Sequence, residues 1–390
     1  MRTQVGIVGA GPAGLLLSHL LARAGIDSVV LESRSRSYVE QRVRAGVLEH
    51  PTVELLREVG LGERLDREGM AHEGIALRFA DEEHRIDFAD LVGRGIVVYG
   101  QQEVVKDLIA ARLADGAGAG AGDVRFEATD VTVDGIADGP VIGFTHEGVR
   151  EELHCDVIAG CDGFHGTTRA AVAPQGFDRQ YPFAWLGILA KAAPIREELV
   201  YARHDDGFAL YSMRSPEVTR LYLQVPLDTD PDDWSDARIW DELHRRLGTE
   251  INEGPLLEKG VTGMRSFVAE PMRRGKLFLA GDAAHIVPPT GAKGMNLAIA
   301  DVRVLAGALA DHLLRGDDRG IDAYSEVCLR RVWRAEHFSW WMTSMLHVDP
   351  GADAFAHRLQ LSQLRYTVSS RAAATSLAEN YVGPPHGSSW

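Results

Sequence analysis

The feature of this sequence that most constrains its fold is a glycine-rich segment near the N-terminus. Gly9, Gly11 and Gly14 form the pattern G-x-G-x-x-G. It follows an apolar strand predicted at residues 4–8 and opens a helix predicted at residues 15–24. In such a unit the first glycine allows a tight turn, the second admits a pyrophosphate, and the third lets helix and strand pack closely. We therefore predict a phosphate site at the helix N-terminus.

A second predicted strand, at residues 28–31, completes the unit. It ends at Glu32, whose carboxylate can accept hydrogen bonds from ribose hydroxyls. The glycine pattern alone would be compatible with an ordinary turn. Strand, helix, second strand and acidic residue in this order indicate a βαβ dinucleotide site.

Length and composition limit the class of protein. A chain of 390 residues is long enough for about two to three domains. A net charge of -15 argues against a nucleic-acid partner, which needs a basic face. The apolar start is broken by Pro12 and the glycines, so it resembles neither a signal peptide nor a membrane span. Three cysteines suggest neither a disulfide framework nor a zinc site, and we predict a cytoplasmic protein.

The pattern changes along the chain. Aromatic and β-branched residues alternate with polar ones over residues 181–226, which predicts an antiparallel sheet. A buried strand is predicted at residues 276–280, and helices at 294–314 and 324–345. We predict an α/β fold in which a Rossmann-like βαβ domain is interrupted by a mainly antiparallel substrate domain and followed by a helical C-terminal region. The predicted boundaries are 1–72, 96–180 and 262–312 for the dinucleotide domain, 73–95 and 181–261 for the substrate domain, and 313–390 for the helical region.

Polar side chains gather on one face of the predicted sheet. Ser212 and Arg214 share a face, as do Arg220 and Tyr222 after a Ser-Pro-Glu turn. A hairpin centred on residue 217 would pair Ser212 with Tyr222 and Arg214 with Arg220. The alternatives are a solvated sheet face and a clamp for a carboxylate, which arginine binds in a bidentate manner.

Two further segments each follow an apolar strand: Ala-Gly-Cys-Asp-Gly at residues 159–163 and Phe-Leu-Ala-Gly-Asp-Ala-Ala-His at residues 278–285. With these, the chain resembles the class A FAD-dependent aromatic hydroxylases from end to end. The other segments that carry the resemblance are residues 42–49, 72–74, 208–214, 280–296, 338–343 and 379–383. The resemblance implies an FAD-binding domain, NAD(P)H and O2 as co-substrates, and a homodimer. It also implies hydroxylation of 4-hydroxybenzoate at the 3-position through a flavin hydroperoxide.

The resemblance implies two groups of residues around the substrate. The carboxylate would be bound by Ser212, Arg214 and Tyr222. The phenol would meet Tyr201, Tyr381, His72 and the carbonyl of Pro289. Removing the phenol proton raises electron density at the ortho carbon, and a Tyr–Tyr–His chain lets the proton leave a closed site. His72 is expected to titrate near neutrality at the outer end of this chain.

The resemblance also implies cofactor contacts. Those to FAD are Gly9, Gly11, Gly14, Glu32, Arg42, Arg44, Gln101, Arg220, Asp282, Lys293 and Asn296. Those to NAD(P)H are Arg34, Tyr38, Arg42, His165 and Arg265. The segment at residues 33–38 departs from the family pattern, so NADPH is favoured while NADH stays open. His285 has no second ligand cluster beside it, so no metal is predicted.

Two alternatives stay open. One is a related hydroxylase that acts on another phenol, such as 3-hydroxybenzoate or a 4-aminobenzoate-like compound. The set Tyr201, Ser212, Arg214, Tyr222 and Tyr381 argues against it. The other is a non-catalytic FAD-fold protein that binds a partner, which would need neither a carboxylate clamp nor a proton relay.

Overall fold

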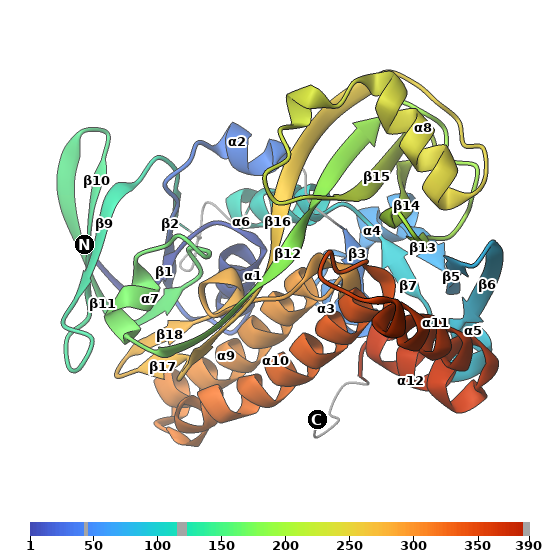
Figure 1. Ribbon diagram of the computed structural model, residues 1–390. Helices are drawn as coiled ribbons and strands as arrows, with labels where there is room; N and C mark the ends of the chain where they lie inside the picture. Colours follow the sequence, from blue (N-terminus) through green and yellow to red (C-terminus); the bar gives the residue numbers. More distant parts are fainter. Residues whose placement is uncertain (43–45, 115–122, 385–390) are drawn as a thin grey trace.

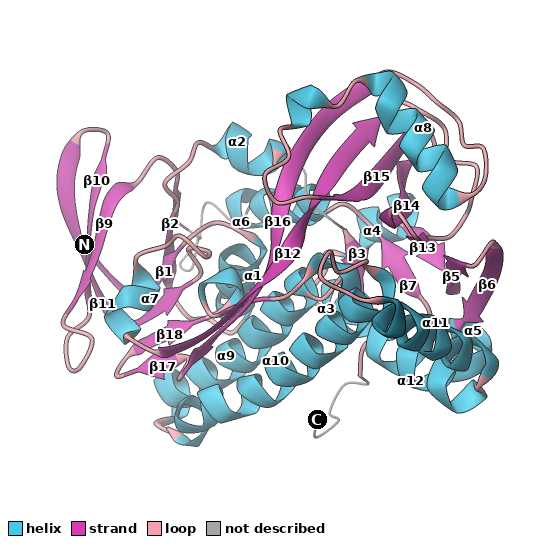
Figure 2. Cartoon of the chain, viewed as in Figure 1, coloured by secondary structure: helices cyan, strands magenta, loops and turns pink. Residues whose placement is uncertain are grey.

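The computed structural model describes residues 1–42, 46–114 and 123–384. Its strands form two eight-stranded sheets and one three-stranded sheet, and its longest helices lie together along one side (Figures 1 and 2). The small sheet joins β3 (Val47–Leu48), β7 (Ile96–Val98) and β4 (Met70–His72). This arrangement confirms the predicted α/β fold with an inserted antiparallel sheet and a helical C-terminal region.

The first sheet carries the predicted βαβ unit. Its order is β17 (Arg273–Arg274), β18 (Leu277–Leu279), β11 (Val149–Gly160), β1 (Arg2–Val8), β2 (Ser28–Leu31) and β8 (Asp123–Arg125). β9 (Thr129–Asp134) and β10 (Val141–His146) extend β11 as an antiparallel hairpin. β1 pairs in parallel with both β2 and β11, and all four residues of β2 are buried. Burial on both faces explains why the inner parts of these strands, residues 5–8 and 29–31, contain no polar side chain.

Helices cover this sheet. α1 (Pro12–Arg23) packs beside α9 (Gly294–Arg315) and α6 (Gln101–Ala114). The N-terminal half of the chain also contains the short helices α2 (Arg36–Gln41), α3 (His50–Glu58), α4 (Gly62–Glu68) and α7 (Thr168–Val172). The predicted strand at residues 28–31 is confirmed to the residue, and the predicted helix at 294–314 is one residue short.

The second sheet is antiparallel except where β13 meets β5. Its order is β19 (His285–Ile286), β16 (Leu256–Glu270), β12 (Gln175–Ala190), β15 (Val218–Val225), β14 (Gly207–Ser215), β13 (Val200–His204), β5 (Gly74–Phe79) and β6 (Glu82–Asp87). α8 (Asp236–Leu247) packs on β13 and β14, and α5 (Phe88–Val92) follows β6. The long strands β12 and β16 run from the nucleotide side of the molecule into this sheet (Figure 1). They therefore cross the predicted domain boundaries near residues 180 and 261.

The C-terminal third is helical. α10 (Arg319–Leu346) lies along α9, and α11 (Ala354–Ser369) and α12 (Arg371–Val382) pack together beside the second sheet (Figure 2). Short 3-10 turns occur at Pro231–Asp233, Gly281–Ala283 and Pro289–Gly291. None of the helices in the described chain combines the length and apolarity needed to cross a bilayer.

Candidate active site

The glycine-rich loop has the geometry that a bound pyrophosphate requires. Gly9 has a positive φ of 106°, and a Cβ there would lie 2.3 Å from the carbonyl oxygen of Cys161. A Cβ on Gly14 would lie 1.9 Å from the carbonyl oxygen of Gly9, so only glycine allows this helix to pack so closely. Beside Gly11 nothing lies within 4 Å of that position. The loop is thus tight at its two ends and open at its centre, which fits the pyrophosphate of FAD.

Glu32 connects this loop to the end of β2. Its Oε2 accepts a hydrogen bond of 2.8 Å from the backbone N–H of Ala10, and its Oε1 accepts one of 2.8 Å from that of Arg34. A carboxylate has about four acceptor positions, so ribose hydroxyls can bind the same group.

The hairpin of β14 and β15 differs from its predicted register. Ser212 lies opposite Arg220, and Leu210 opposite Tyr222, so the predicted pairing of Ser212 with Tyr222 is wrong by two residues. The turn is tighter than predicted because Ser215 pairs with Val218. A shift by two keeps Ser212, Arg220 and Tyr222 on their predicted face, since side chains alternate with a period of two.

Arg214 lies at a β-bulge. The register shifts between Met213 and Ser215, which leaves Arg214 without a partner in the ladder of β14 and β15. The predicted pairing of Arg214 with Arg220 is therefore also wrong.

In the part of the chain that the structure describes, the guanidinium of Arg214 has no acidic partner. Its Nη1 donates a 3.1 Å hydrogen bond to the carbonyl of Met213, while its buried Nε has no hydrogen-bond acceptor among the described residues. Burial lowers the pKa of Arg214, and the neighbouring Arg220 lowers it further, whereas Tyr222 opposes the shift. A buried donor without an acceptor is destabilising unless a ligand supplies one.

Two tyrosines meet at the other end of the same sheet face. The hydroxyls of Tyr201 and Tyr381 lie 2.5 Å apart, and each side chain is 1% exposed. Burial raises the pKa of both phenols, so both are neutral at neutral pH. Phe88 and Phe338 pack against the ring of Tyr381 and fix its position. The structure thus joins residues that stand far apart in the sequence.

The surroundings of His72 differ from those that titration near neutrality would require. It is 1% exposed on β4, and in the described chain neither ring nitrogen has a hydrogen-bond partner. Burial lowers its pKa to about 4, and the charge of Glu198 opposes this only in part. The expectation that His72 titrates near neutrality is therefore wrong, because the apolar surroundings disfavour its charged form.

Lys293 and Glu49 form a buried ion pair behind Tyr381. The Nζ of Lys293 lies 2.6 Å from Glu49 Oε1 and donates a 3.1 Å hydrogen bond to the carbonyl of Tyr381. Burial lowers the pKa of Lys293, and Glu49 opposes the shift. The ammonium group is thus engaged within the protein, and it holds the C-terminal helix against the start of α9.

The side chain of Asn296 is also fully used within the protein. Its Oδ1 accepts from the N–H of Glu49 and the hydroxyl of Thr52, and its Nδ2 donates to the carbonyls of Val47 and Ala292. Contact between Asn296 and FAD would therefore use the backbone of this residue, in the first turn of α9. The carbonyl of Pro289 accepts from the N–H of Ala292 at 3.0 Å and keeps a second lone pair.

The predicted coenzyme residues form two groups. In the first, Arg34 and Arg42 lie over the ring of Tyr38, at 5.3 and 6.0 Å from its centroid. In the second, His165 meets the edge of Phe164, and Arg265 lies 4.4 Å above that ring.

Sequence reasoning missed a member of the second group. Arg169 lies 4.5 Å from the centre of the Phe164 ring and also covers Phe267. Its position four residues after His165 in the same motif was the available signal. Arg265 is also paired with Asp178, which raises its pKa.

The remaining predicted residues lie as follows. Arg220 donates from Nε to the hydroxyl of Tyr222 at 3.3 Å, Gln101 begins α6, and half-buried Asp282 follows β18. Arg44 falls outside the described residues. His285 is paired with Asp301 at 2.6 Å, and the described part of the chain holds no group of three or more metal-ligating side chains.

Comparison with known proteins agrees with this geometry. Residues 2–339 match a family model described as an FAD binding domain. A p-hydroxybenzoate hydroxylase from Acinetobacter baylyi is 48% identical over 395 residues, covering 99% of this chain and 96% of that protein. A 3-(3-hydroxy-phenyl)propionate/3-hydroxycinnamic acid hydroxylase from Mycobacterium avium is 26% identical, covering 83% of this chain and 57% of that protein.

A solved structure shares the fold. The crystal structure of p-nitrophenol 4-monooxygenase from Pseudomonas putida DLL-E4 superimposes with a TM-score of 0.83 at 19% identity, covering 98% of this chain and 99% of that one. The fold alone does not define the family. The family match over residues 2–339 and the 48% identity over 99% of this chain do so. The chain belongs to the p-hydroxybenzoate hydroxylase family of FAD-dependent aromatic monooxygenases.

Proposed function

We propose that this enzyme hydroxylates 4-hydroxybenzoate at the 3-position, giving 3,4-dihydroxybenzoate, with O2 and NAD(P)H as co-substrates. One observation carries the proposal. Tyr201 pairs with Leu210, and Leu210 pairs with Tyr222, so the three side chains form a row across one sheet face. Two strand spacings separate the tyrosines by about 10 Å. The guanidinium of Arg214, whose Nε lacks an acceptor among the described residues, interacts with Tyr222 at one end of this row, and Tyr381 meets Tyr201 at the other.

The clamp end suits a carboxylate. An anionic oxygen would give the Nε of Arg214 the acceptor that it lacks, and hydrogen bonds between charged groups are the stronger kind. Ser212 and Tyr222 add hydroxyl donors on the same face. The row between the ends is apolar, with Leu210 5% exposed, which suits an aromatic ring.

The tyrosine end suits a phenol that must lose a proton. Tyr201 would hydrogen-bond the substrate oxygen and share its proton with Tyr381 through their short contact. The carbonyl of Pro289 would face the same oxygen. His72 is a neutral acceptor, and its lowered pKa means that it would release a proton rather than retain it. Bound FAD supplies the oxygen chemistry, while these residues position the ring and exclude water.

The cofactor contacts are part of the proposal. The glycine-rich loop and Glu32 would hold the pyrophosphate and ribose of FAD, with Arg42, Arg44, Gln101, Arg220 and Asp282 as further contacts. Lys293 would act through its charge and Asn296 through its backbone. The two groups around Tyr38 and Phe164 would bind NADPH, with NADH as the alternative.

The decisive experiment is an assay of the purified, FAD-loaded protein. We expect 4-hydroxybenzoate to stimulate NADPH oxidation and to yield 3,4-dihydroxybenzoate, detected by chromatography. 3-Hydroxybenzoate and 4-aminobenzoate serve as comparators, since a better rate with either would point to a different substrate. A yellow protein that oxidises no NADPH or NADH with any of the three would contradict a catalytic role.

We further propose a cytoplasmic homodimer. Three apolar side chains on α11 are more than half exposed: Phe355, Leu359 and Tyr366. A second copy would remove this surface from water. The three cysteines are free, which fits a reducing compartment. Light scattering should give twice the chain mass, and Leu359→Glu should lower it; a monomer at micromolar concentration would contradict the dimer.

A further inference from the structure

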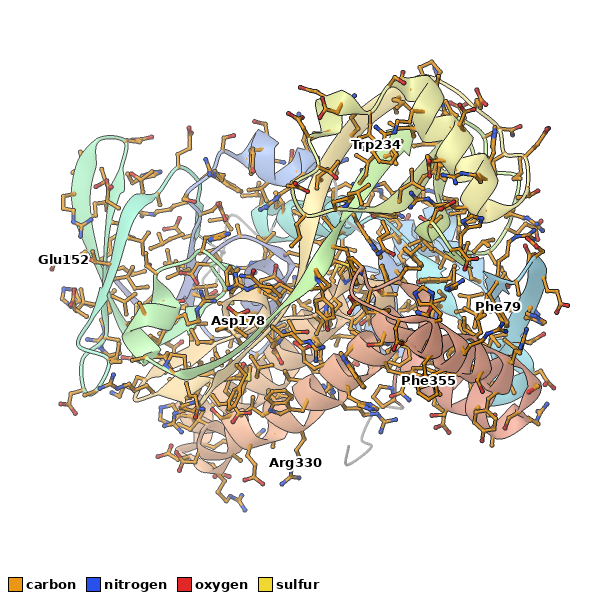
Figure 3. The ribbon with its side chains drawn as sticks, viewed as in Figure 1. Phe79, Glu152, Asp178, Trp234, Arg330 and Phe355 are labelled. Carbon is orange, nitrogen blue, oxygen red and sulfur yellow. The ribbon has the colours of Figure 1, made fainter. Side chains whose placement is uncertain are left out.

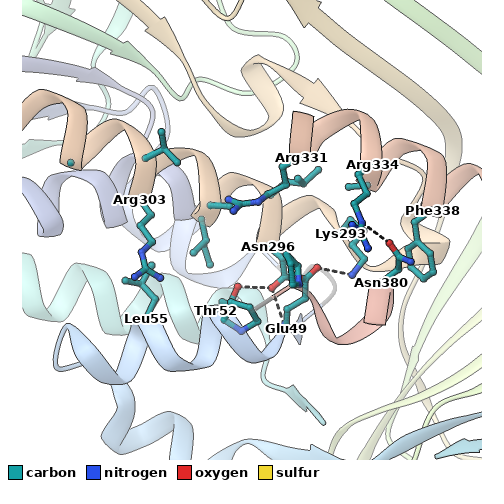
Figure 4. Close-up of a pocket in the computed structure, with 18 residues that line it drawn as sticks. Glu49, Thr52, Leu55, Lys293, Asn296, Arg303, Arg331, Arg334, Phe338 and Asn380 are labelled. Atoms are coloured by element: carbon teal, nitrogen blue, oxygen red, sulfur yellow. Dashed lines mark hydrogen bonds and ion pairs between the residues drawn. The ribbon is translucent and has the colours of Figure 1, made fainter. Parts of the chain in front are cut away.

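A groove opens between α3, α9 and α10, outside the substrate row (Figure 4). Its volume is about 440 Å³, within the range of small-molecule sites. Leu55, Leu297, Ile299, Val304 and Phe338 make its walls largely apolar. Apart from Lys293 and Asn296, the residues that line this groove have no part in the chemistry proposed above.

The groove and the nucleotide loop lie on opposite sides of α9. Ala298 faces the loop side, because a Cβ on Gly281 would lie 3.1 Å from it and 3.3 Å from Ala13 on α1. A helix turns by about 100° per residue. The groove residues Ala300 and Gly307 are therefore rotated by about half a turn from Ala298. The helix therefore separates this part of the groove from the nucleotide loop, while Lys293 and Asn296 line the groove at the N-terminal end of α9.

Positive charge predominates in the groove. Four cationic side chains line it, against Glu49 as the carboxylate: Lys293, Arg303, Arg331 and Arg334. Lys293 is paired with Glu49, Arg303 lies 3.8 Å from Glu58, and Arg334 donates to Asn380 at 3.0 Å. Figure 4 shows the three arginines among the residues that line the groove. On a chain with a net charge of -15, such a site attracts small anions.

Arg331 provides a second, independent observation. Its Nε is buried, and no hydrogen-bond acceptor for it occurs among the described residues. A ligand that satisfies this buried N–H and also fits the apolar walls would carry an anionic group on an apolar ring or chain. The flat guanidinium favours a carboxylate, and the ring of Phe338 favours an aromatic one.

We propose that this groove is a second ligand site that binds a small aromatic carboxylate. The carboxylate pairs with Arg331, and the ring lies against Val304 and Phe338. The ligand touches Lys293 and Phe338, which both contact Tyr381. The site does not depend on the proposed function of the substrate row.

Equilibrium dialysis of FAD-loaded enzyme against radiolabelled 4-hydroxybenzoate tests this site. We expect two sites per chain in the wild type. Gly307→Phe should leave one, because no atom lies within 4 Å of a Cβ there and the new ring would fill the groove. Arg331→Gln should weaken the second site by about ten-fold or more. Arg214→Gln should abolish the other site and keep the groove site.

Arg330→Gln is the matched control. Arg330 is the neighbouring residue on α10, its side chain is 59% exposed, and it pairs with Glu326 at the surface. We expect this variant to keep both sites. The absorbance spectrum of bound FAD verifies that each variant is folded, and Arg331→Gln carries the test if Gly307→Phe does not fold.

Two results would overturn the proposal: a single site in the wild type, or a second site that survives both Gly307→Phe and Arg331→Gln. Displacement of the label by acetate as effectively as by benzoate would show a general anion site, and the aromatic assignment would fall. A groove site without a site that depends on Arg214 would instead reject the proposed function and leave this one intact.

Discussion

The two ends of the substrate row differ in charge and in origin. At one end Arg214 brings a buried positive charge whose Nε has no acceptor among the described residues, on a hairpin whose residues are close in sequence. At the other end Tyr201 and Tyr381 bring two neutral hydroxyls that are 180 residues apart in the chain. The Arg214 end can bind an anion by its fixed charge. The tyrosine end is neutral and can only share a proton with its ligand.

The difference shows how one apolar row can both bind and activate a substrate. The fixed charge of Arg214 gives affinity and orientation, because it attracts the carboxylate equally before and after the phenol loses its proton. Neutral groups with raised pKa values avoid a second charge and respond only when the phenol proton moves. Substitutions at the two ends should therefore separate binding from hydroxylation.

The largest effect is expected at the charged end. Arg214→Gln should weaken binding of 4-hydroxybenzoate by about 3–5 kcal/mol, as for a broken buried ion pair, which is a hundred-fold or more. Titration of bound FAD fluorescence measures this affinity. Arg196→Gln removes an exposed arginine paired with Glu83 and serves as control. Unchanged affinity in Arg214→Gln would reject the clamp.

Substitution at the tyrosine end should affect turnover rather than substrate binding. Tyr201→Phe should retain substrate binding but hydroxylate about 100-fold more slowly or worse, so that little product forms per NADPH oxidised. Tyr211→Phe is the control, because Tyr211 lies on the opposite face of β14 and accepts from the N–H of Ile195. Full coupling of oxidation to product in Tyr201→Phe would disprove the relay.

His72, at the outer part of the tyrosine end, should make the free energy of unfolding depend on pH. His72 has a pKa of about 4 when folded and 6.5 when free. Between these values the unfolded chain binds a proton that the folded chain does not. The free energy of unfolding should therefore fall as the pH falls from about 6.5 to 4, by about 3 kcal/mol from this group.

Urea unfolding at several pH values measures this dependence. His72→Gln should make it shallower, whereas replacement of the exposed His154 should leave it unchanged. Buried His347, whose pKa is lowered to about 3, contributes in all three proteins. An identical pH dependence in His72→Gln and wild type would show that His72 is not held neutral.

The smallest effect is expected at Arg34 and Arg36, whose charges lie at the solvated surface. Arg34 lies over Tyr38, and Arg36 forms a 2.7 Å ion pair with Glu40 at the surface. Replacing both arginines by glutamine should raise the KM for NADPH by about ten-fold and leave that for NADH nearly unchanged. Equal changes in both KM values would count against recognition of the 2′-phosphate.

Local chemistry explains what the sequence predicted. The glycine loop, β2 and the polar face of the hairpin depend on residues within about 30 positions of one another, so spacing alone indicates them. The register of the hairpin was missed because a bulge at Arg214 absorbs one residue without any glycine to mark it. A period of two nevertheless preserved the face.

Long-range packing explains what it did not predict. The lowered pKa of His72 arises from its burial, which the short strand β4 gives no periodicity to indicate. The full use of Asn296 by Val47, Glu49, Thr52 and Ala292 depends on how α3 meets α9. The groove beside Arg331 depends on three helices, and no motif marks it.

The long pair β12 and β16 has a consequence for how such enzymes diversify. Gln175 and Glu270 are partners in register, so the chain departs from the nucleotide half and returns to it at neighbouring points. Five of the eight strands of the second sheet lie within this excursion. A module anchored on one two-stranded stem can be reshaped for a new aromatic compound while the flavin half keeps its geometry.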